Sequence, residues 1–174
     1  MAKERAGVVT FKGGPLTLIG PELKVGDKAP EFEVIDGGLN PVHLASSKGK
    51  VRLFSAVPSL DTPVCSIQTK RFGEALASLP PEVQFYTVSA DLPFAQKRWC
   101  GAESVDVVTL SDHRKLSFAE SYGLLIKELR LLARAVIVVD AQDRIAYVQI
   151  VPEVTSEPDY EEALEAAKKA AGAT

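Results

Sequence analysis

The chain has 174 residues, of which 46% are hydrophobic and 25% are charged, and its formal net charge at pH 7 is −3. Such a chain can bury a core without disulfides or a structural metal, which predicts one domain over residues 1–174. This composition argues against disorder, and the charge argues against a nucleic-acid partner. The apolar runs are only strand-sized, and the opening MAKERAGVVTFKGG lacks the apolar core of a signal peptide. We therefore expect a cytoplasmic protein with no membrane partner.

The first half of the chain is typical of a hairpin followed by a strand, a helix and a strand. Within residues 8–19 the runs VVTF and LTLI flank Gly-Gly-Pro, which is a hairpin signal. A strand–helix–strand unit crosses over right-handedly, so its two strands should be parallel neighbours. The elements expected after the hairpin are strands at 31–35, 51–57 and 83–89, with a helix from Thr62 to about Leu79 between the last two.

A short helix, LPFAQKRWCGA, is expected to start at Asp91 and Pro93 and to carry the second cysteine, Cys100. Its apolar stripe is expected at Leu92, Ala95 and Trp99. Cys100 lies about 100° away from that stripe, so it should be only marginally anchored. Gly101 should close the helix.

The remaining segments complete a mixed α/β order. A strand is expected at 105–110 and a helix at 115–122, stopped by Gly123. Two strongly apolar strands, 133–139 and 144–151, are joined by a tight polar segment and should form an antiparallel hairpin at one side of the sheet. A final helix should cover the sheet with Tyr160, Leu164, Ala167 and Ala171 on one face. This order predicts a mixed central sheet flanked by helices.

Cys65 is the residue around which we expect chemistry. Thr62 is suited to an N-cap and Pro63 to the first helical position, which makes Cys65 the third helical residue. Unpaired amides and the positive end of the helix dipole favour a thiolate there. Cys65 shares a helical stripe with Phe72, so its sulfur should face inward. The carboxylate of Asp61 would oppose a thiolate, so that side chain should point elsewhere. A buried, inert cysteine is the alternative.

Arg134 is the best candidate to stabilise a thiolate, because it is the only charge within residues 131–139. Such a guanidinium must either find an anion or reach water at the edge of the sheet, and the sequence leaves both alternatives open. His43 and His113 stand in separate polar stretches and are interpreted as loop histidines, which argues against a hydrolytic Cys–His pair. Activation by helix amides, a hydroxyl and an arginine needs no general base and suits attack on an O–O bond.

Four sequence blocks, between about Val8 and the end of the chain, carry a resemblance to a known family. Pro58, Thr62 and Cys65 stand in a P-x-x-x-T-x-x-C spacing, and SADLPFAQKRWCGAE contains Cys100. The third block is LLARAVIVVD, with its arginine at position 134, and the fourth is VPEVTSEPDYEEAL. Together these blocks resemble the thiol peroxidases, atypical two-cysteine peroxiredoxins with a thioredoxin-like fold.

The resemblance implies roles for the candidate residues. Cys65 would be the peroxidatic cysteine, attacking hydrogen peroxide or an alkyl hydroperoxide and becoming a sulfenic acid. Cys100 would resolve it as an intramolecular disulfide, which thioredoxin would reduce. Thr62 would hydrogen-bond the sulfur and the peroxide, Arg134 would stabilise negative charge, and Pro58 would shield the site from water. No metal or flavin cofactor would be required, and a homodimer built around the active-site face is expected.

One departure from the family concerns the segment after Cys100. Ser104 and Val105 follow CGAE, where family members often have a glycine and a slightly longer loop. A disulfide requires Cα atoms within roughly 7 Å, so if the reduced cysteines are farther apart, one helix must partly unwind in each cycle. We predict that the weakly anchored Cys100 helix and the first turn at Cys65 both move. Two further readings stay open. One is a redox sensor whose disulfide changes a partner surface, and the other is an interaction module with inert thiols.

Overall fold

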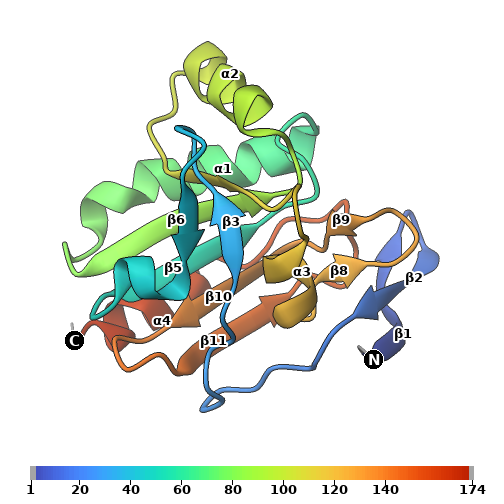
Figure 1. Ribbon diagram of the computed structural model, residues 1–174, viewed down its shortest axis with the longest axis horizontal. Coiled ribbons are helices and arrows are strands. Elements are labelled where there is room, and N and C mark those ends of the chain that lie inside the picture. Colours follow the sequence, from blue (N-terminus) through green and yellow to red (C-terminus); the bar gives the residue numbers. More distant parts are fainter. Residues whose placement is uncertain (1–2, 173–174) are drawn as a thin grey trace.

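The structure is a computed structural model that describes residues 3–172, and its main body is a mixed sheet (Figure 1). The strands of this sheet are β3 (Glu33–Ile35), β4 (Pro41–His43), β5 (Val51–Ala56), β6 (Val83–Ser89), β7 (Thr109–Ser111), β10 (Ala135–Val139) and β11 (Ile145–Ile150). Their spatial order is β11-β10-β5-β6-β7-β3-β4. The expected strand–helix–strand unit is confirmed, because β5 and β6 are parallel, and β11 lies at one edge, antiparallel to β10, as expected.

A second, smaller sheet contains the expected N-terminal hairpin. Its strands are β1 (Glu4–Phe11), β2 (Gly14–Ile19), β8 (Leu125–Ile126) and β9 (Leu131–Leu132), in the order β1-β2-β8-β9. The hairpin strands β1 and β2 pair antiparallel, and β2 also pairs with β8. Figure 1 shows this hairpin at the side of the molecule next to β8.

Helices cover the main sheet. They are α1 (Pro63–Ala75), α2 (Pro93–Glu103), α3 (Ser117–Ser121) and α4 (Tyr160–Ala170), with 3-10 turns η1 (Leu44–Ser47) and η2 (Leu76–Ser78). Side chains alternate along the central strands, so Leu53 packs with α1 and α4, whereas its neighbour Phe54 packs on the α3 side. All six residues of β5 are buried because apolar layers cover both of its faces. Within residues 3–172, no helix is long and apolar enough to cross a bilayer.

Helix α2 differs from its prediction in its buried face and its end. The buried side chains are Pro93 and Gln96, whereas Leu92 is 52% exposed and Ala95 is also exposed. The side chain of Gln96 faces the main sheet, where its Nε2 donates a hydrogen bond to the carbonyl oxygen of Leu110 at 2.9 Å. The expected stripe therefore holds only for Trp99, which is partly buried. Helix α2 also continues through Gly101 and ends where Ser104 adopts a left-handed conformation, with φ of 54°.

The strand expected at 105–110 was also wrong in its extent, since pairing is limited to β7. The side chains of Val105 and Val107 instead pack against Gly73 of α1, where an added Cβ would lie 3.3 to 3.4 Å from their methyl groups. Their apolar character thus comes from contact with a helix and not from the sheet. The other expected elements are present, some shorter: β3 begins at Glu33 and α3 at Ser117.

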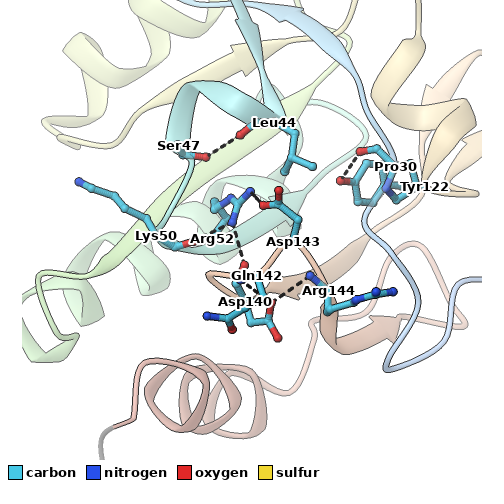
Figure 2. Close-up of polar contacts among 10 residues, drawn as sticks. All are labelled: Pro30, Leu44, Ser47, Lys50, Arg52, Tyr122, Asp140, Gln142, Asp143 and Arg144. Carbon is cyan, nitrogen blue, oxygen red and sulfur yellow. Dashed lines mark hydrogen bonds and ion pairs between the residues drawn. The ribbon is translucent and has the colours of Figure 1, made fainter.

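An arginine that the sequence did not single out, Arg52 of β5, is fully buried (Figure 2). Its Nη1 donates to the carbonyl oxygens of Lys50 and Asp140 at 2.7 and 2.8 Å, and its Nη2 pairs with the carboxylate of Asp143. The register of β5 and β10 places Arg52 opposite Val139. Arg52 therefore lies at the end of this strand pair where β10 finishes.

Candidate active site

Cys65 lies in the first turn of α1, at the carboxyl end of β5. Thr62 occupies the N-cap position and Pro63 the first helical position, so the predicted start of this helix is confirmed. The side chain of Cys65 is fully buried, in a small cluster with Val57 and Leu60 against which Trp99 packs. The prediction of an inward-facing sulfur is therefore correct, and Asp61 is exposed at the surface.

Arg134 takes the buried alternative of the two that the sequence left open. It is only 2% exposed and donates three hydrogen bonds. Its Nη2 donates to the sulfur of Cys65 at 3.2 Å, its Nη1 to Oε1 of Gln68 at 3.0 Å, and its Nε to the carbonyl oxygen of Val154 at 2.8 Å. A fixed positive charge that donates a hydrogen bond to sulfur can stabilise negative charge that develops there during a reaction. The guanidinium of Arg134 is thus oriented toward the sulfur of Cys65.

Gln68 was missed by the sequence analysis. It is fully buried, one turn after Cys65, and its Nε2 donates to Oγ of Ser55 at 2.7 Å while its Oε1 accepts from Arg134. It therefore connects the guanidinium to strand β5. The signal that was present is a polar residue three positions after Cys65, on the inward stripe of the helix, because a buried amide needs partners there.

Thr62 has the predicted position but makes a different hydrogen bond. Its hydroxyl donates to the carbonyl oxygen of Ser59 at 3.0 Å and does not cap the helix. Among residues 3–172 no hydrogen bond joins this hydroxyl to the sulfur of Cys65. Because the Thr62 hydroxyl bonds to the loop, the first-turn amides of α1 have no side-chain cap.

A cavity of about 610 Å³ opens beside this cluster. Most of its lining is apolar, and it brings together three of the residues proposed from the sequence, Pro58, Thr62 and Arg134. The other lining residues are Phe11, Lys12, Ser59, Pro63, Val64, Leu129, Leu131, Val154 and Thr155. The apolar wall can therefore contact the apolar tail of a small molecule whose polar group lies near Thr62 and Arg134.

Cys100 does not line this cavity. It lies on α2, is partly buried, and is a free thiol, as is Cys65. Burial, with a smaller contribution from the carboxylate of Asp106, raises the pKa of the Cys100 thiol. In this arrangement the thiolate of Cys100, which is its nucleophilic form, is therefore disfavoured.

Neither histidine belongs to the site. His43 is exposed, with Nε2 3.6 Å from the carboxylate of Glu33. His113 is also exposed, and its Nδ1 lies 2.9 Å from Oγ of Ser111. Within the described part of the chain neither ring has a hydrogen bond to Cys65, so a Cys–His pair is not formed.

Comparison with known proteins places this geometry in context. Residues 24–164 match the profile of the Redoxin family. A thiol peroxidase of Halalkalibacterium halodurans is 59% identical over 93% of this chain and 98% of its own length. A thiol peroxidase of Bacillus subtilis is 56% identical over 92% of this chain and 96% of its own.

Solved structures agree with the expected fold. A peroxiredoxin-like protein from Aquifex aeolicus superposes with a TM-score of 0.88 at 44% identity, covering 97% of this chain and 98% of that one. A thiol peroxidase from Chromobacterium violaceum has a TM-score of 0.78 at 21% identity, covering 92% and 95%, and supports the fold alone. The chain has the thioredoxin-like fold with an N-terminal hairpin that the sequence predicted.

Proposed function

The chain belongs to the Redoxin family and, within it, to the thiol peroxidases, and from this premise we propose that it reduces hydrogen peroxide and alkyl hydroperoxides through Cys65. The single observation that carries the proposal is the hydrogen bond from Nη2 of Arg134 to the sulfur of Cys65. It couples the one buried thiol of the chain to a buried cation beside an open cavity. A redox enzyme needs this combination, whereas an inert cysteine does not.

In the first step the thiolate of Cys65 attacks the terminal oxygen of the hydroperoxide. The O–O bond breaks, the sulfur becomes a sulfenic acid, and the leaving alkoxide takes a proton and departs as an alcohol, or as water from hydrogen peroxide. Arg134 stabilises the thiolate and the charge that develops on the leaving oxygen. Thr62 donates to the peroxide after its hydroxyl turns away from Ser59, and Pro58 keeps water out.

The cavity supports organic hydroperoxides as substrates. Its wall is made largely of apolar side chains, among them Phe11, Leu129 and Leu131, so an alkyl group can be buried there while the peroxide group meets Thr62 and Arg134. Hydrogen peroxide needs only the polar end. The proposal therefore includes both substrates.

In the second step Cys100 resolves the sulfenic acid. Its sulfur attacks the sulfur of Cys65, water leaves, and an intramolecular disulfide forms. Thioredoxin then reduces this disulfide by thiol–disulfide exchange. Because burial raises the pKa of Cys100, a movement of α2 that exposes this thiol would make it more reactive. A single domain over residues 1–174, a homodimer and a cytoplasmic location complete the proposal.

The test is peroxide consumption in the presence of thioredoxin, thioredoxin reductase and NADPH. The unsubstituted chain should turn over, and Cys65→Ser should not. Cys100→Ser should consume about one equivalent of peroxide and then stop at the sulfenic acid, unless another thiol is added. Full activity of Cys65→Ser would overturn the assignment. No specific contact favours the sensor reading, and stoichiometric oxidation without turnover would be its signature.

A further inference from the structure

The carboxylate of Asp91 joins two segments that each lead to a cysteine. Asp91 follows β6 and precedes α2, the helix of Cys100. Its Oδ2 accepts from the backbone N–H of Leu60 at 2.8 Å, and its Oδ1 accepts from Oγ of Ser59 at 2.6 Å. Ser59 and Leu60 belong to the loop that leads to Cys65. One side chain thus holds this loop against the base of α2.

The same carboxylate is linked to the interior of α2 through Ser89. Oγ of Ser89 donates to Oδ2 of Asp91 at 2.8 Å and accepts from Nε2 of Gln96 at 3.0 Å. Gln96 is fully buried and is the main buried polar residue of α2. Its Oε1 has no hydrogen-bond partner among the described residues, and an unsatisfied buried acceptor makes the packing of this helix less favourable in free energy. In Figure 1, α2 lies at the margin of the molecule, beyond the strand ends.

The packing in this region depends on the same connection. Leu60, whose amide Asp91 binds, is buried with Cys65, and Trp99 of α2 packs against that pair. A displacement of α2 from this position would take Trp99 out of the cluster and would disrupt the hydrogen bonds between Asp91 and the loop. We call the arrangement in this structure, in which Cys65 contacts Arg134, the closed arrangement, and an arrangement with α2 displaced the open one. The hydrogen bonds of Asp91 belong to the closed arrangement.

We propose that Asp91 is a positioning residue that sets how readily the two cysteine segments open, and with it the rate of disulfide formation. The proposal rests on the function proposed above, since it takes Cys100 as the resolving thiol. Removing the carboxylate should destabilise the closed arrangement and leave the open one unchanged. Cys65 is fully buried, and Cys100 lies outside its cluster, so the proposal takes the two sulfurs to meet only in the open arrangement. The rate constant of disulfide formation should then rise in proportion to the open population.

The test separates oxidation from resolution in a single turnover. The reduced chain is mixed with increasing hydrogen peroxide, and the fluorescence of Trp99, the one tryptophan of the chain, reports on the cluster around Cys65. The phase that depends on peroxide gives the oxidation rate constant, and the phase that does not gives the resolution rate constant. Asp91→Ala should raise the resolution rate constant about tenfold and change the oxidation rate constant by less than about threefold.

Two variants give matched comparisons. Asp61→Ala also removes one carboxylate, from the loop that leads to Cys65, but the Asp61 carboxylate is exposed and accepts no hydrogen bond among residues 3–172, so both rate constants should stay as they are. Asp91→Asn keeps an oxygen for the N–H of Leu60 and should give an intermediate rate. If Asp91→Ala does not fold, Ser59→Ala removes the donor to Oδ1 and should raise the resolution rate constant about two- to threefold.

A second readout distinguishes positioning from general destabilisation. Further oxidation of the sulfenic acid to sulfinic acid competes with resolution. Asp91→Ala should therefore need about tenfold more peroxide for half-inactivation, whereas a chain that is only less stable would need less. An unchanged or lower resolution rate constant in Asp91→Ala overturns the proposal. If the peroxide-independent phase persists in Cys100→Ser, the proposed function fails instead, because Cys100 is then not the resolving thiol.

Discussion

Nη2 of Arg134 lies 3.2 Å from the sulfur of Cys65, although the two residues are 69 positions apart in the sequence. The antiparallel pairing of β5 and β10 explains this proximity. Ala135 is paired with Ala56, so Arg134, which precedes β10, lies at the end of the sheet where the chain leaves β5 for α1. The register of two buried strands therefore sets the position of the guanidinium relative to the sulfur.

Replacing Arg134 should slow peroxide reduction far more than it affects folding. In Arg134→Met the second-order rate constant for oxidation of Cys65 should fall about 10²- to 10³-fold, because the donor that stabilises the developing charge is lost. Rapid mixing with hydrogen peroxide measures this rate constant. Arg52→Met is the matched control, since Arg52 is equally buried but lies at the other end of the β5–β10 pair. Its rate constant should stay within about threefold of the original. Equal losses in both variants would assign the effect to stability.

Gln68 should matter through Arg134. In Gln68→Leu, Nη1 of Arg134 loses its acceptor and Oγ of Ser55 loses its donor, so the guanidinium is less firmly oriented. The oxidation rate constant should fall about tenfold, which corresponds to roughly one buried hydrogen bond. Gln149→Leu, in β11, is the comparison and should leave the rate constant unchanged. A normal rate in Gln68→Leu would show that Arg134 is held well enough by Val154 alone.

Thr62 should act through its hydroxyl and not through its shape. Thr62→Ser keeps the donor at the cavity and should stay within about threefold, whereas Thr62→Val should lower the oxidation rate constant about 10- to 100-fold. The measurement is initial oxidation by hydrogen peroxide and by a bulkier alkyl hydroperoxide. If Thr62→Val is as fast as the unsubstituted chain with both peroxides, the hydroxyl has no part in the reaction.

The stability of the fold should depend on pH through Asp112. Burial raises the pKa of this carboxyl to about 6, although backbone amides of α3 donate to it. The folded chain therefore holds this proton more tightly than the unfolded one, and the contribution of Asp112 to stability falls as pH rises from about 4 through about 6. Asp112→Asn does not titrate. In urea unfolding, the free energy of unfolding of the unsubstituted chain should fall relative to that of Asp112→Asn by on the order of 2 kcal/mol between pH 4 and pH 7. A constant difference would contradict this.

Much of the fold was accessible from periodicity and turn residues. The hairpin β1–β2, the parallel pair β5–β6 and helix α4 follow local rules that tertiary packing did not override. The errors concern segments whose partners lie far along the chain. Val105 reads as a strand residue, but its side chain packs against Gly73, and α2 turns the amide of Gln96 inward toward Leu110. Neither partner is identifiable from local sequence.

The candidate site shows the same division. The start of α1 and the inward direction of Cys65 depend on a cap position, a proline and a helical repeat, all of which are local. The buried state of Arg134 was one of two open alternatives, because only the three-dimensional partners Cys65, Gln68 and Val154 decide it. The hydroxyl of Thr62 binds Ser59, a preference that the competing acceptors of the loop determine.

The most direct test of the central claim is peptide mapping after one equivalent of hydrogen peroxide. The account predicts that both thiols of each chain disappear together, that one Cys65–Cys100 cross-link forms within a single chain, and that Cys100→Ser carries a sulfenic acid at Cys65. Peroxide consumption that leaves the thiol of Cys65 free would contradict it.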